Sequence, residues 1–271
     1  MAFMTKEDTV CVQFAGRSFF LDTAGGMDRV AATIAAGNYE VPLPIMLAAM
    51  VSRVPGMFLD VGANDGVYSV IAAAIKPDLR IAAFEPVPQI ANLLRRNIEL
   101  NDIAGRVDIY ELALSDSEGI VPIFLPDPAH GLIETSASLE ENFIVGATPA
   151  MSVRTTKLDN LTLPAAIGVA KVDIEGFELE FIRGAEETIR RDRPVIFAEM
   201  LSRVERKFPE ITQRMIDMDY LMFRLRPDAA ILSHWISFDQ QSWNYCLLPR
   251  EKMNVFRECC VTHQLEILAP A

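Results

Sequence analysis

The sequence predicts an α/β fold built on one doubly wound, mostly parallel β-sheet. Short, almost wholly apolar runs alternate along the chain with longer amphipathic stretches, a pattern typical of strand–helix–strand units. The chain has 271 residues, a length that suits one large α/β domain. Its hydrophobic share of 51% supplies enough apolar surface for a buried core.

The first part of the chain is expected to form an extension that packs on this core. Residues 9–21 (TVCVQFAGRSFFL) contain two apolar runs around Ala15-Gly16-Arg17 and predict a hairpin. Helical patterns follow at 27–36 and 43–53, and Pro55-Gly56 ends the second one. Residues 1–54 are therefore interpreted as an N-terminal hairpin and helical extension.

The regular alternation covers residues 55–250, which we interpret as the functional domain, followed by a C-terminal tail at 251–271. Helices are predicted where apolar residues recur with the α-helical period, at 67–75, 88–101, 178–191 and 208–218. Strands are predicted at the short apolar runs 57–61, 80–84, 107–112, 120–125, 153–157, 169–173, 195–199, 221–225 and 244–248. The segment 120–125 is expected to be antiparallel, and the last two strands are expected to close the sheet as a hairpin.

A polar stretch with Pro and Ser residues, 126–151, interrupts this alternation. Long loops without periodicity are often lids over a functional site, so we interpret it as a lid insertion. His130 lies in this stretch and is a candidate general base. The alternative for His130 is a solvated loop histidine.

Charge and composition exclude several kinds of protein. With Lys+Arg 25 and Asp+Glu 37, the formal net charge of −12 argues against nucleic acid as a partner, because a backbone binder needs a basic face. No stretch is long and apolar enough for a transmembrane segment, and the first residues do not resemble a signal peptide. The 4 cysteines form no C-x-x-C motif, so a reduced, cytoplasmic chain is expected.

The strongest motif is FLDVGANDGVYS at residues 58–69, where a buried strand runs into a glycine-rich turn and then a helix. Gly62 and Gly66 allow the backbone to approach a ligand closely. Their spacing breaks the G-x-G-x-x-G pattern of nicotinamide dinucleotide sites. Asp60 precedes the turn, and its carboxylate suits a ligand with a cationic amine better than a pyrophosphate.

An acidic residue also follows the second strand of the domain, in FEPVP. Glu85 is placed to accept hydrogen bonds from both hydroxyls of a ribose. Pro86 keeps the turn extended. The alternative is a solvated acid at the end of a strand.

In KVDIEGFE, Asp173, Glu175 and Glu178 lie at the end of a buried strand. Charge is costly at such a place unless something requires it. A favourable interaction with the helix dipole is an alternative explanation for Glu178, but it is weaker for Asp173, which is still on the strand.

The chain resembles the FkbM family of methyltransferases that use S-adenosyl-L-methionine (SAM). The matching stretches occur in order across 55–250: FLDVGANDGVYS, FEPVP with NIELN, ELALSDSEG, TTKLDNL, AKVDIEGFELEFIRGA, RPVIFAEM and NYCLLPRE. The resemblance implies a class I Rossmann-like fold, with a seven-stranded sheet whose last strand is antiparallel. It also implies methyl transfer to a hydroxyl oxygen of a sugar, glycolipid or natural product.

Carried over onto the matching positions, the resemblance implies a site for SAM. The glycine-rich turn would hold the methionine part, Asp60 would face the methionine amine and Glu85 would bind the ribose hydroxyls. The adenine would lie at the end of the third strand, and Asp173 would lie near the sulfonium. The residues assigned in this way are Tyr39, Glu40, Asp60, Gly62, Ala63, Asn64, Gly66, Glu85, Pro86, Leu112, Ala113, Asp116 and Asp173.

A hydroxyl acceptor must also lose its proton. A carboxylate or a histidine within hydrogen-bond distance can accept it, and the candidates are Asp173, Glu175, Glu199 and His130. Asp173 and Glu199 end neighbouring strands and have the oxygen ligands that magnesium or manganese prefers. A divalent cation is allowed by this chemistry but not expected, because two carboxylates are too few, and no metal ligand is assigned.

Two other functions stay open on the sequence alone. One is an NAD(P)-dependent oxidoreductase on a Rossmann-like fold, against which the broken glycine pattern and the terminal hairpin argue. The other is a catalytically inactive SAM-binding scaffold, against which the retention of Asp60, Glu85 and Asp173 argues. The sequence names neither the small-molecule or glycan acceptor nor the oligomeric state, and a homo-oligomer is left open.

Overall fold

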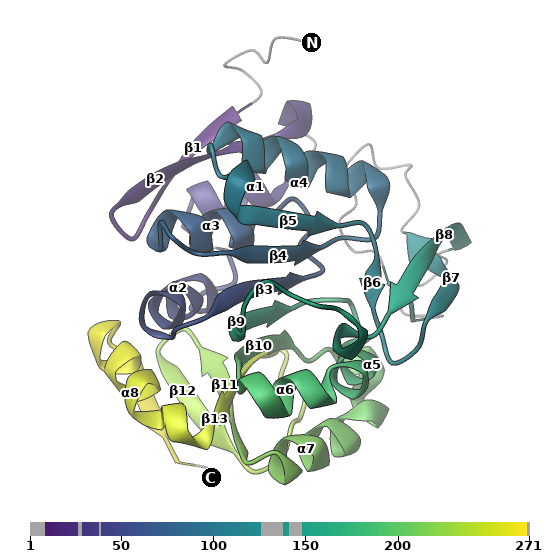
Figure 1. The fold of residues 1–271 in the computed structure, drawn as a ribbon. Helices are drawn as coiled ribbons and strands as arrows, with labels where there is room; N and C mark the ends of the chain where they lie inside the picture. The colour runs from purple at the N-terminus through teal and green to yellow at the C-terminus, as the bar shows by residue number, and fades with distance from the viewer. Residues whose placement is uncertain (1–8, 27–28, 38, 126–137, 141–147, 270–271) are drawn as a thin grey trace.

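Nine strands form a mixed sheet through the centre of the molecule, and helices cover both of its faces (Figure 1). The computed structural model describes residues 9–26, 29–37, 39–125, 138–140 and 148–269. The strands of the sheet are β3 (Met57–Val61), β4 (Ile81–Phe84), β5 (Val107–Tyr110), β9 (Ile167–Val172), β10 (Val195–Glu199), β11 (Tyr220–Arg226), β12 (Ala229–Ser233), β13 (Asn244–Pro249) and β14 (Glu266–Leu268). Their spatial order is β14-β12-β11-β13-β10-β9-β3-β4-β5.

The direction of the strands agrees with the predicted α/β class. From β5 through β4, β3 and β9 to β10, neighbouring strands are parallel. β13 pairs antiparallel with β10 on one side and with β11 on the other, so the expected pairing of the two late strands is confirmed. Parallel strands place all their carboxyl ends at one edge of the sheet, and this edge holds the site described below.

Helices bury both faces of the sheet, which explains why its strands read as continuous apolar runs. One face is covered by α2 (Leu43–Arg53), α3 (Val67–Ile75), α4 (Pro88–Leu100) and α8 (Met253–Thr262). The other is covered by α5 (Glu178–Gly184), α6 (Glu186–Asp192) and α7 (Phe208–Asp217). Adjacent residues of β3 serve opposite cores: Phe58 packs with the first set of helices and Leu59 with the second.

The N-terminal hairpin prediction is confirmed. β1 (Thr9–Phe14) and β2 (Arg17–Asp22) pair antiparallel, and α1 (Arg29–Ala35) follows them. Asn97 of α4 and Asn101, the residue that follows α4, hold the hairpin: Asn101 Oδ1 accepts from the Phe20 amide at 2.9 Å and Asn97 Oδ1 accepts from the Asp22 amide at 2.7 Å. These are the two asparagines of the NIELN stretch.

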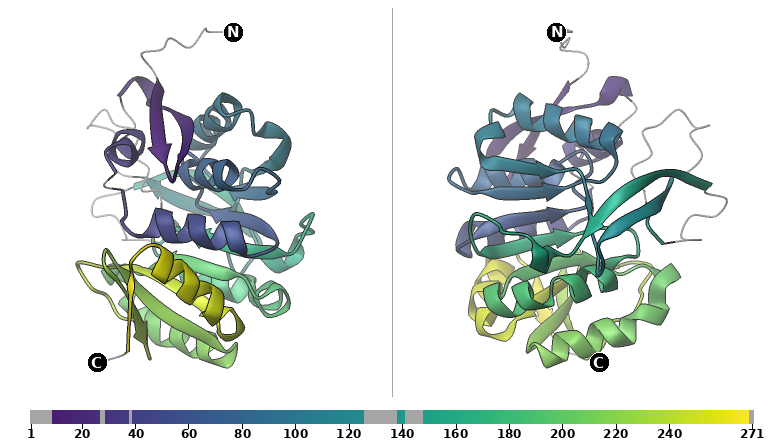
Figure 2. Two further views of the ribbon diagram at one scale, coloured as in Figure 1. Left: turned by 90° about the vertical axis from the view of Figure 1, so that its left-hand side faces the viewer. Right: turned by 45° about the vertical axis from the view of Figure 1, so that its right-hand side comes forward.

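A second, smaller sheet projects from the carboxyl side of β5 (Figure 2, right). It contains β6 (Ala113–Leu114), β7 (Gly119–Leu125) and β8 (Thr148–Thr156) in the order β6-β8-β7. The predicted antiparallel segment becomes β7, which pairs with β8. Of the expected lid insertion, 126–137 and 141–147 lie outside the described residues, and 148–151 already belong to β8.

Three expectations need correction. The sheet has nine strands instead of seven, because β12 folds back on β11 and β14 adds in parallel to β12. The expected strand 107–112 ends at Tyr110, because the chain leaves the main sheet to form β6. The single helix expected at 178–191 is two helices that meet at Ala185, because the backbone of Ala185 (φ −121°, ψ 7°) is not helical.

The last residues also have defined structure. No element was predicted after residue 250, but α8 and β14 lie there, with Phe256, Cys259 and Cys260 fully buried. All four cysteines are free. Among the residues that the structure describes, no helix combines the length and the apolar character needed to span a bilayer.

Candidate active site

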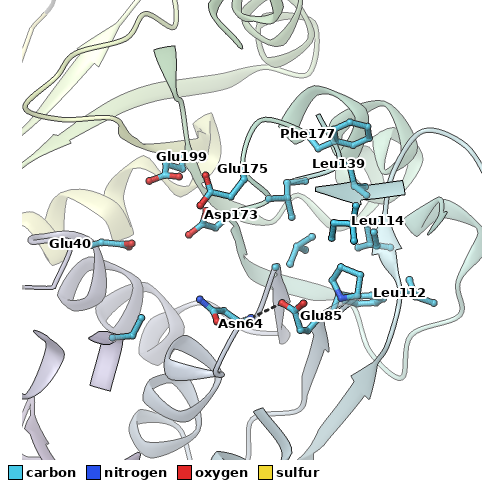
Figure 3. A pocket seen from close by; sticks show the side chains of 18 of the residues that line it. Glu40, Asn64, Glu85, Leu112, Leu114, Leu139, Asp173, Glu175, Phe177 and Glu199 are labelled. Carbon is cyan, nitrogen blue, oxygen red and sulfur yellow. Dashed lines mark hydrogen bonds between the residues drawn. The ribbon is translucent and has the colours of Figure 1, made fainter. Parts of the chain in front are cut away.

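The carboxyl ends of β3, β4, β9 and β10 open onto a cavity of about 250 Å³ (Figure 3). Its wall is chemically divided. The carboxylates of Glu40, Asp173, Glu175 and Glu199 gather at one end, and the side chains of Leu112, Leu114, Leu139 and Phe177 lie at the other (Figure 3). Glu85 and Asn64 lie between the two ends.

The glycine-rich turn after β3 forms the floor of the cavity. Gly62 has a φ of 73°, and a Cβ there would lie 1.8 Å from the carbonyl oxygen of Asp173. The turn is bonded to both neighbouring strands, because Phe84 O accepts from the Gly62 amide at 3.0 Å and Val61 O accepts from the Asp173 amide at 3.0 Å. Glycine is therefore required at 62 by the packing of β3 against β9, a reason that the sequence did not reveal.

Glu85 occupies the position predicted for it, at the cavity and after β4. Its Oε2 accepts from the Asn64 amide at 3.1 Å and its Oε1 accepts from the Val87 amide at 2.9 Å. Burial raises the pKa of this carboxyl to about 7, although both amide hydrogen bonds favour the ionised form. Each carboxylate oxygen keeps a lone pair with which it can accept a further donor.

Asn64 supplies a second polar atom at the same place. Its amide Oδ1 is buried and has no hydrogen-bond partner within the described part of the chain. Because buried polar atoms are rarely left unsatisfied, this oxygen is suited to accept from a donor on a bound ligand.

Asp60 does not reach the cavity wall. It is 1% exposed, and its Oδ2 accepts from the Ser69 hydroxyl of α3 at 2.6 Å. Burial raises the pKa of its carboxyl to about 7, against the opposing effects of Ser69 and Lys171. Side chains alternate along a strand, and Asp60 lies on the same face as Phe58, beneath α3.

Three of the four candidate bases form one acidic cluster. Carboxylate oxygens of Asp173, Glu175 and Glu199 lie within 4.8 Å of one another. Burial raises the pKa of Glu199 well above its usual range, and the charges of Asp173 and Glu175 add to this effect. His130, the fourth candidate, lies outside the described residues.

A buried lysine partly compensates the acidic cluster. Lys171 is 1% exposed, and its Nζ donates to Asp173 Oδ2 at 2.9 Å. Burial opposes its charge, but the carboxylates of Asp173, Glu40 and Glu199 outweigh burial and raise the pKa of the ammonium above its ordinary range. Lys171 therefore stays a cation and is unsuited to act as a proton acceptor.

Glu40 extends the acidic end of the cavity, and with Tyr39 it was expected to cover the cofactor from its place before β3. It accepts a short hydrogen bond from the Tyr68 hydroxyl, and burial raises its pKa. Tyr39 lines the cavity beside it. That the two residues contact a cofactor stays a prediction.

The remaining predicted residues divide into two groups. Pro86, Leu112 and Ala113 line the cavity, as expected for residues after β4 and β5. Ala63, Gly66 and Asp116 do not line it, and Asp116 instead pairs with Arg183 at 3.4 Å. Sequence reasoning missed Leu139 and Phe177, which reach the cavity from segments without a recognisable ligand motif.

Carboxylate oxygens are the ligands that magnesium and manganese prefer. The acidic cluster of Asp173, Glu175 and Glu199 is therefore the group of described residues with the donors to hold a divalent cation. The sequence offered two of these carboxylates on strand ends, and the structure adds Glu175 to them. The expectation that this site binds no divalent cation stays a prediction.

The sheet and the site together define a Rossmann-like α/β protein whose ligand cavity lies at the carboxyl ends of its parallel strands. A family model described as "Methyltransferase FkbM domain" matches residues 60–222. The chain therefore belongs to the FkbM methyltransferase family, which confirms the resemblance read from its motifs.

Several characterised proteins are similar to this chain over about half of its length. Methyltransferase sdnD of Sordaria araneosa is 28% identical over 48% of this chain and 60% of its own. The 2-O-methyltransferase NoeI of Sinorhizobium fredii is 26% identical over 54% of this chain and 64% of its own. The 31-O-demethyl-FK506 methyltransferase FkbM of Streptomyces tacrolimicus is 29% identical over 49% and 61%. The chain thus spans about three fifths of the length of these relatives.

A solved structure of a methyltransferase FkbM from Methylobacillus flagellatus is also similar in its fold. It is 16% identical, covers 70% of this chain and 43% of its own chain, and gives a TM-score of 0.47.

Proposed function

We propose that the chain is a SAM-dependent methyltransferase that methylates a hydroxyl oxygen of a small-molecule or glycan acceptor. The observation that carries the proposal is the meeting of two kinds of acid in one cavity. Glu85, held by two backbone amides, faces the middle of the cavity, and the acidic cluster of Asp173, Glu175 and Glu199 stands at one end. Glu85 suits the binding of ribose hydroxyls. The acidic cluster suits the binding of a cation and the removal of a proton from the acceptor.

The divided wall of the cavity supports one orientation of the cofactor. The ribose hydroxyls would donate to Glu85, and the buried Oδ1 of Asn64 would accept from a nearby donor. The apolar end, with Leu112 and Leu114, suits the adenine ring. The sulfonium and the methionine amine would then lie toward the carboxylates, which favour positive charge. Asp60 would act on the amine only through an intervening group, because Ser69 occupies its carboxylate.

When bound, SAM supplies a methyl group on a positively charged sulfur. The chain aligns the acceptor oxygen with the carbon–sulfur bond, and such alignment alone can lower the activation free energy by several kcal/mol. The acceptor oxygen would form its bond to the methyl carbon as the carbon–sulfur bond breaks. Asp173 would take the hydroxyl proton in this scheme, because it borders the cavity and its Oδ2 is held in place by Lys171.

The printed names of two relatives support oxygen as the accepting atom. NoeI is named a 2-O-methyltransferase, and FkbM of Streptomyces tacrolimicus is named for the 31-O position of its acceptor. Membership of the methyltransferase family disfavours the oxidoreductase, and the intact acidic cluster disfavours an inactive scaffold.

The proposal is tested first by ligand binding. SAM and S-adenosylhomocysteine should each raise the melting temperature of the purified chain, since a ligand at 100 times its Kd adds about 2.7 kcal/mol of stability. NAD at the same concentration serves as the control for a dinucleotide site and should leave the melting temperature unchanged. A shift with NAD alone would support the oxidoreductase instead.

A further inference from the structure

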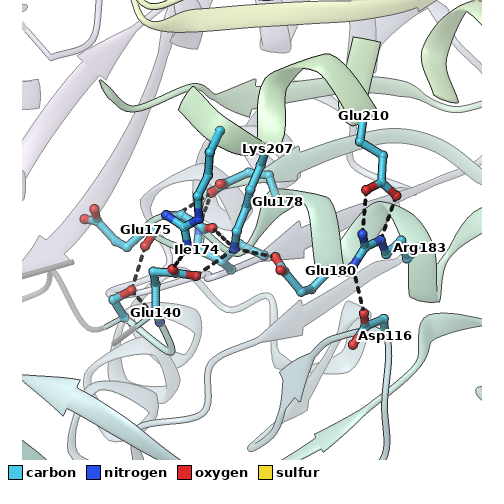
Figure 4. A network of polar contacts seen from close by, with 12 residues as sticks. Asp116, Glu140, Ile174, Glu175, Glu178, Glu180, Arg183, Lys207 and Glu210 are labelled. Atoms are coloured by element: carbon cyan, nitrogen blue, oxygen red, sulfur yellow. Dashed lines mark hydrogen bonds and ion pairs between the residues drawn. The ribbon is translucent and has the colours of Figure 1, made fainter. Parts of the chain in front are cut away.

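A second polar network lies behind the wall of the cavity, around the loop that joins β9 to α5 (Figure 4). Its first part is the three-residue segment Ser138–Leu139–Glu140, which we call the clasp. The Ser138 hydroxyl is the donor of a 2.6 Å hydrogen bond to the carbonyl oxygen of Glu175, and Ser138 is 1% exposed. Ser138 also exchanges two backbone hydrogen bonds with Phe124 of β7, of 2.8 and 3.0 Å. The clasp is thus fixed both to the small sheet and to the loop that carries Glu175.

Lys207 ties the clasp to two further segments. It is 8% exposed and is the last residue of a short 3-10 helix, Ser202–Lys207, that precedes α7. Its ammonium donates to Glu140 Oε2 at 2.7 Å, to Glu180 Oε2 of α5 at 2.8 Å and to the carbonyl oxygen of Gly176 at 2.9 Å. A lysine ammonium has three donors, so one contact with each segment uses all of them.

Two cationic side chains stabilise the ionised carboxylate of Glu140. Arg206 donates a short hydrogen bond to its other carboxylate oxygen. Burial works against ionisation of Glu140, but the hydrogen bonds from Lys207 and Arg206 outweigh burial and lower the pKa of its carboxyl. Charge-assisted hydrogen bonds of this kind are stronger than neutral ones.

The residues between these anchors form part of the cavity wall. Leu139 lies between Ser138 and Glu140 and lines the cavity. Glu175 and Phe177 flank Gly176, which Lys207 contacts, and both line the cavity as well. Lys207 Nζ also lies 4.9 Å from the centre of the Phe177 ring. The network therefore holds three wall residues without touching the cavity itself.

We propose that Glu140 and Lys207 are positioning residues whose ion pair fixes Leu139, Glu175 and Phe177 at the ligand cavity. The ion pair would affect ligand binding through the positions of these three wall residues, because neither Glu140 nor Lys207 lines the cavity. The part of this inference that concerns the cofactor rests on the proposed methyltransferase function. The part that concerns the loop needs no ligand and is tested separately.

The chain offers a matched control on the same side of the molecule. Arg183 of α5 donates to both carboxylate oxygens of Glu210 of α7, at 2.8 and 2.5 Å (Figure 4). Neither residue lines the cavity. Glu210→Gln therefore removes one charge from a bidentate ion pair close by, as Glu140→Gln does from the clasp, but without loosening the wall.

Hydrogen exchange measured by mass spectrometry tests the loop in the absence of ligand. In the Glu140→Gln variant the peptide that contains 173–178 should exchange at least fivefold faster than in the wild type, whereas Glu210→Gln should leave it unchanged. Ser138→Ala, which removes the hydrogen bond to Glu175, should act in the same direction and is the second variant if Glu140→Gln does not fold. Unchanged exchange of 173–178 in a folded clasp variant would overturn the proposal.

Titration calorimetry with S-adenosylhomocysteine tests the effect on the ligand. Glu140→Gln should raise the Kd about tenfold. Glu210→Gln should leave the Kd unchanged, even if the two substitutions lower the melting temperature by the same amount. Equal affinity of wild type and Glu140→Gln would overturn the role at the cavity. If the wild type itself binds no S-adenosylhomocysteine, the proposed function fails, and the exchange rates alone then decide whether the ion pair positions the loop.

Discussion

The ammonium of Lys171 lies 2.9 Å from Oδ2 of Asp173, two residues farther along the chain, and the lysine side chain is 2% exposed. Lys171 lies on β9 and Asp173 is the first residue after that strand, so the ion pair lies at the carboxyl end of β9. The pair joins the buried interior under α3 to the cavity, where Asp173 is 25% exposed. Lys171 thereby provides a fixed positive charge beneath the acidic cluster.

Lys171→Met should reduce the stability of the fold. The substitution leaves Asp173, Glu40 and Glu199 without the cation that compensates them. Breaking a buried pair from one side costs about 3–5 kcal/mol, and the partial exposure of Asp173 should place the loss at the lower end. Urea unfolding measures it. The double variant Lys171→Met/Asp173→Asn should recover part of the loss, and strictly additive effects would contradict the coupling.

Asp173→Asn should reduce turnover while retaining the shape of the side chain. If Asp173 accepts the acceptor's proton, methyl transfer should fall by about 10²–10⁴, the usual range for a general base. The Kd for S-adenosylhomocysteine should change far less. If chelation abolishes activity and magnesium or manganese restores it, Asp173 is a metal ligand, and Glu199→Gln should cause the same loss. Normal turnover by the folded variant would exclude both roles and leave His130 as the leading candidate base.

Glu85→Ala should weaken binding of SAM and S-adenosylhomocysteine by about 1–3 kcal/mol, the range for a charged hydrogen-bond acceptor. The fold should persist with a lower stability, because the substitution leaves the Asn64 and Val87 amides without their acceptor. Titration calorimetry provides the measurement. An affinity equal to that of the wild type would show that the ribose lies elsewhere.

Gly62→Ala should destabilise the fold as well as the site. The added Cβ would meet the Asp173 carbonyl at 1.8 Å, and a φ of 73° is itself unfavourable for alanine. We expect a loss of more than about 1 kcal/mol in urea unfolding. Gly105→Ala is the control, because nothing lies within 4 Å of a Cβ there. Wild-type stability of Gly62→Ala would mean that the turn is packed differently.

Asp60 should make stability depend on pH. Its pKa is about 7 in the folded chain, against roughly 3.9 when unfolded. Between these two pH values Asp60 is protonated in the folded chain but ionised in the unfolded chain. Its contribution to the free energy of unfolding is therefore fully present below about pH 4 and is lost as the pH rises through about 7. Asp60→Asn removes this dependence, so its stability relative to wild type should increase from pH 5 to pH 8 in urea unfolding. A stability difference between Asp60→Asn and the wild type that does not change with pH would refute this.

Much of the sheet was predictable because its strands are buried on both faces and therefore read as apolar runs. β3 and β10 have the residue bounds that the pattern predicted. β12 and β14 were missed for a physical reason: β14 has three residues, and β12 follows β11 after a turn of only two. A strand of three residues is too short to show a period, and a turn of only two residues hides the boundary between β11 and β12.

The strand-end residues of the site were predictable for a different reason. Parallel strands bring their carboxyl ends together, so Glu85, Asp173 and Glu199 could be placed in one cavity from the sequence alone. The direction of Asp60, under Ser69, could not be foreseen, because every residue of β3 is buried. Leu139 reaches the cavity through contacts with distant segments, which a local pattern cannot contain.

The most direct test of the proposed function uses SAM labelled with ¹³C in its methyl group. The purified chain is incubated with it and with a small-molecule extract of the source cell, and the labelled product is identified by mass spectrometry and NMR. We expect a ¹³C methyl group on an oxygen of one acceptor, formed by the wild type, and a yield lower by about 10²–10⁴ with Asp173→Asn. Label that appears on nitrogen or carbon, or equal transfer by the wild type and the variant, would contradict this expectation.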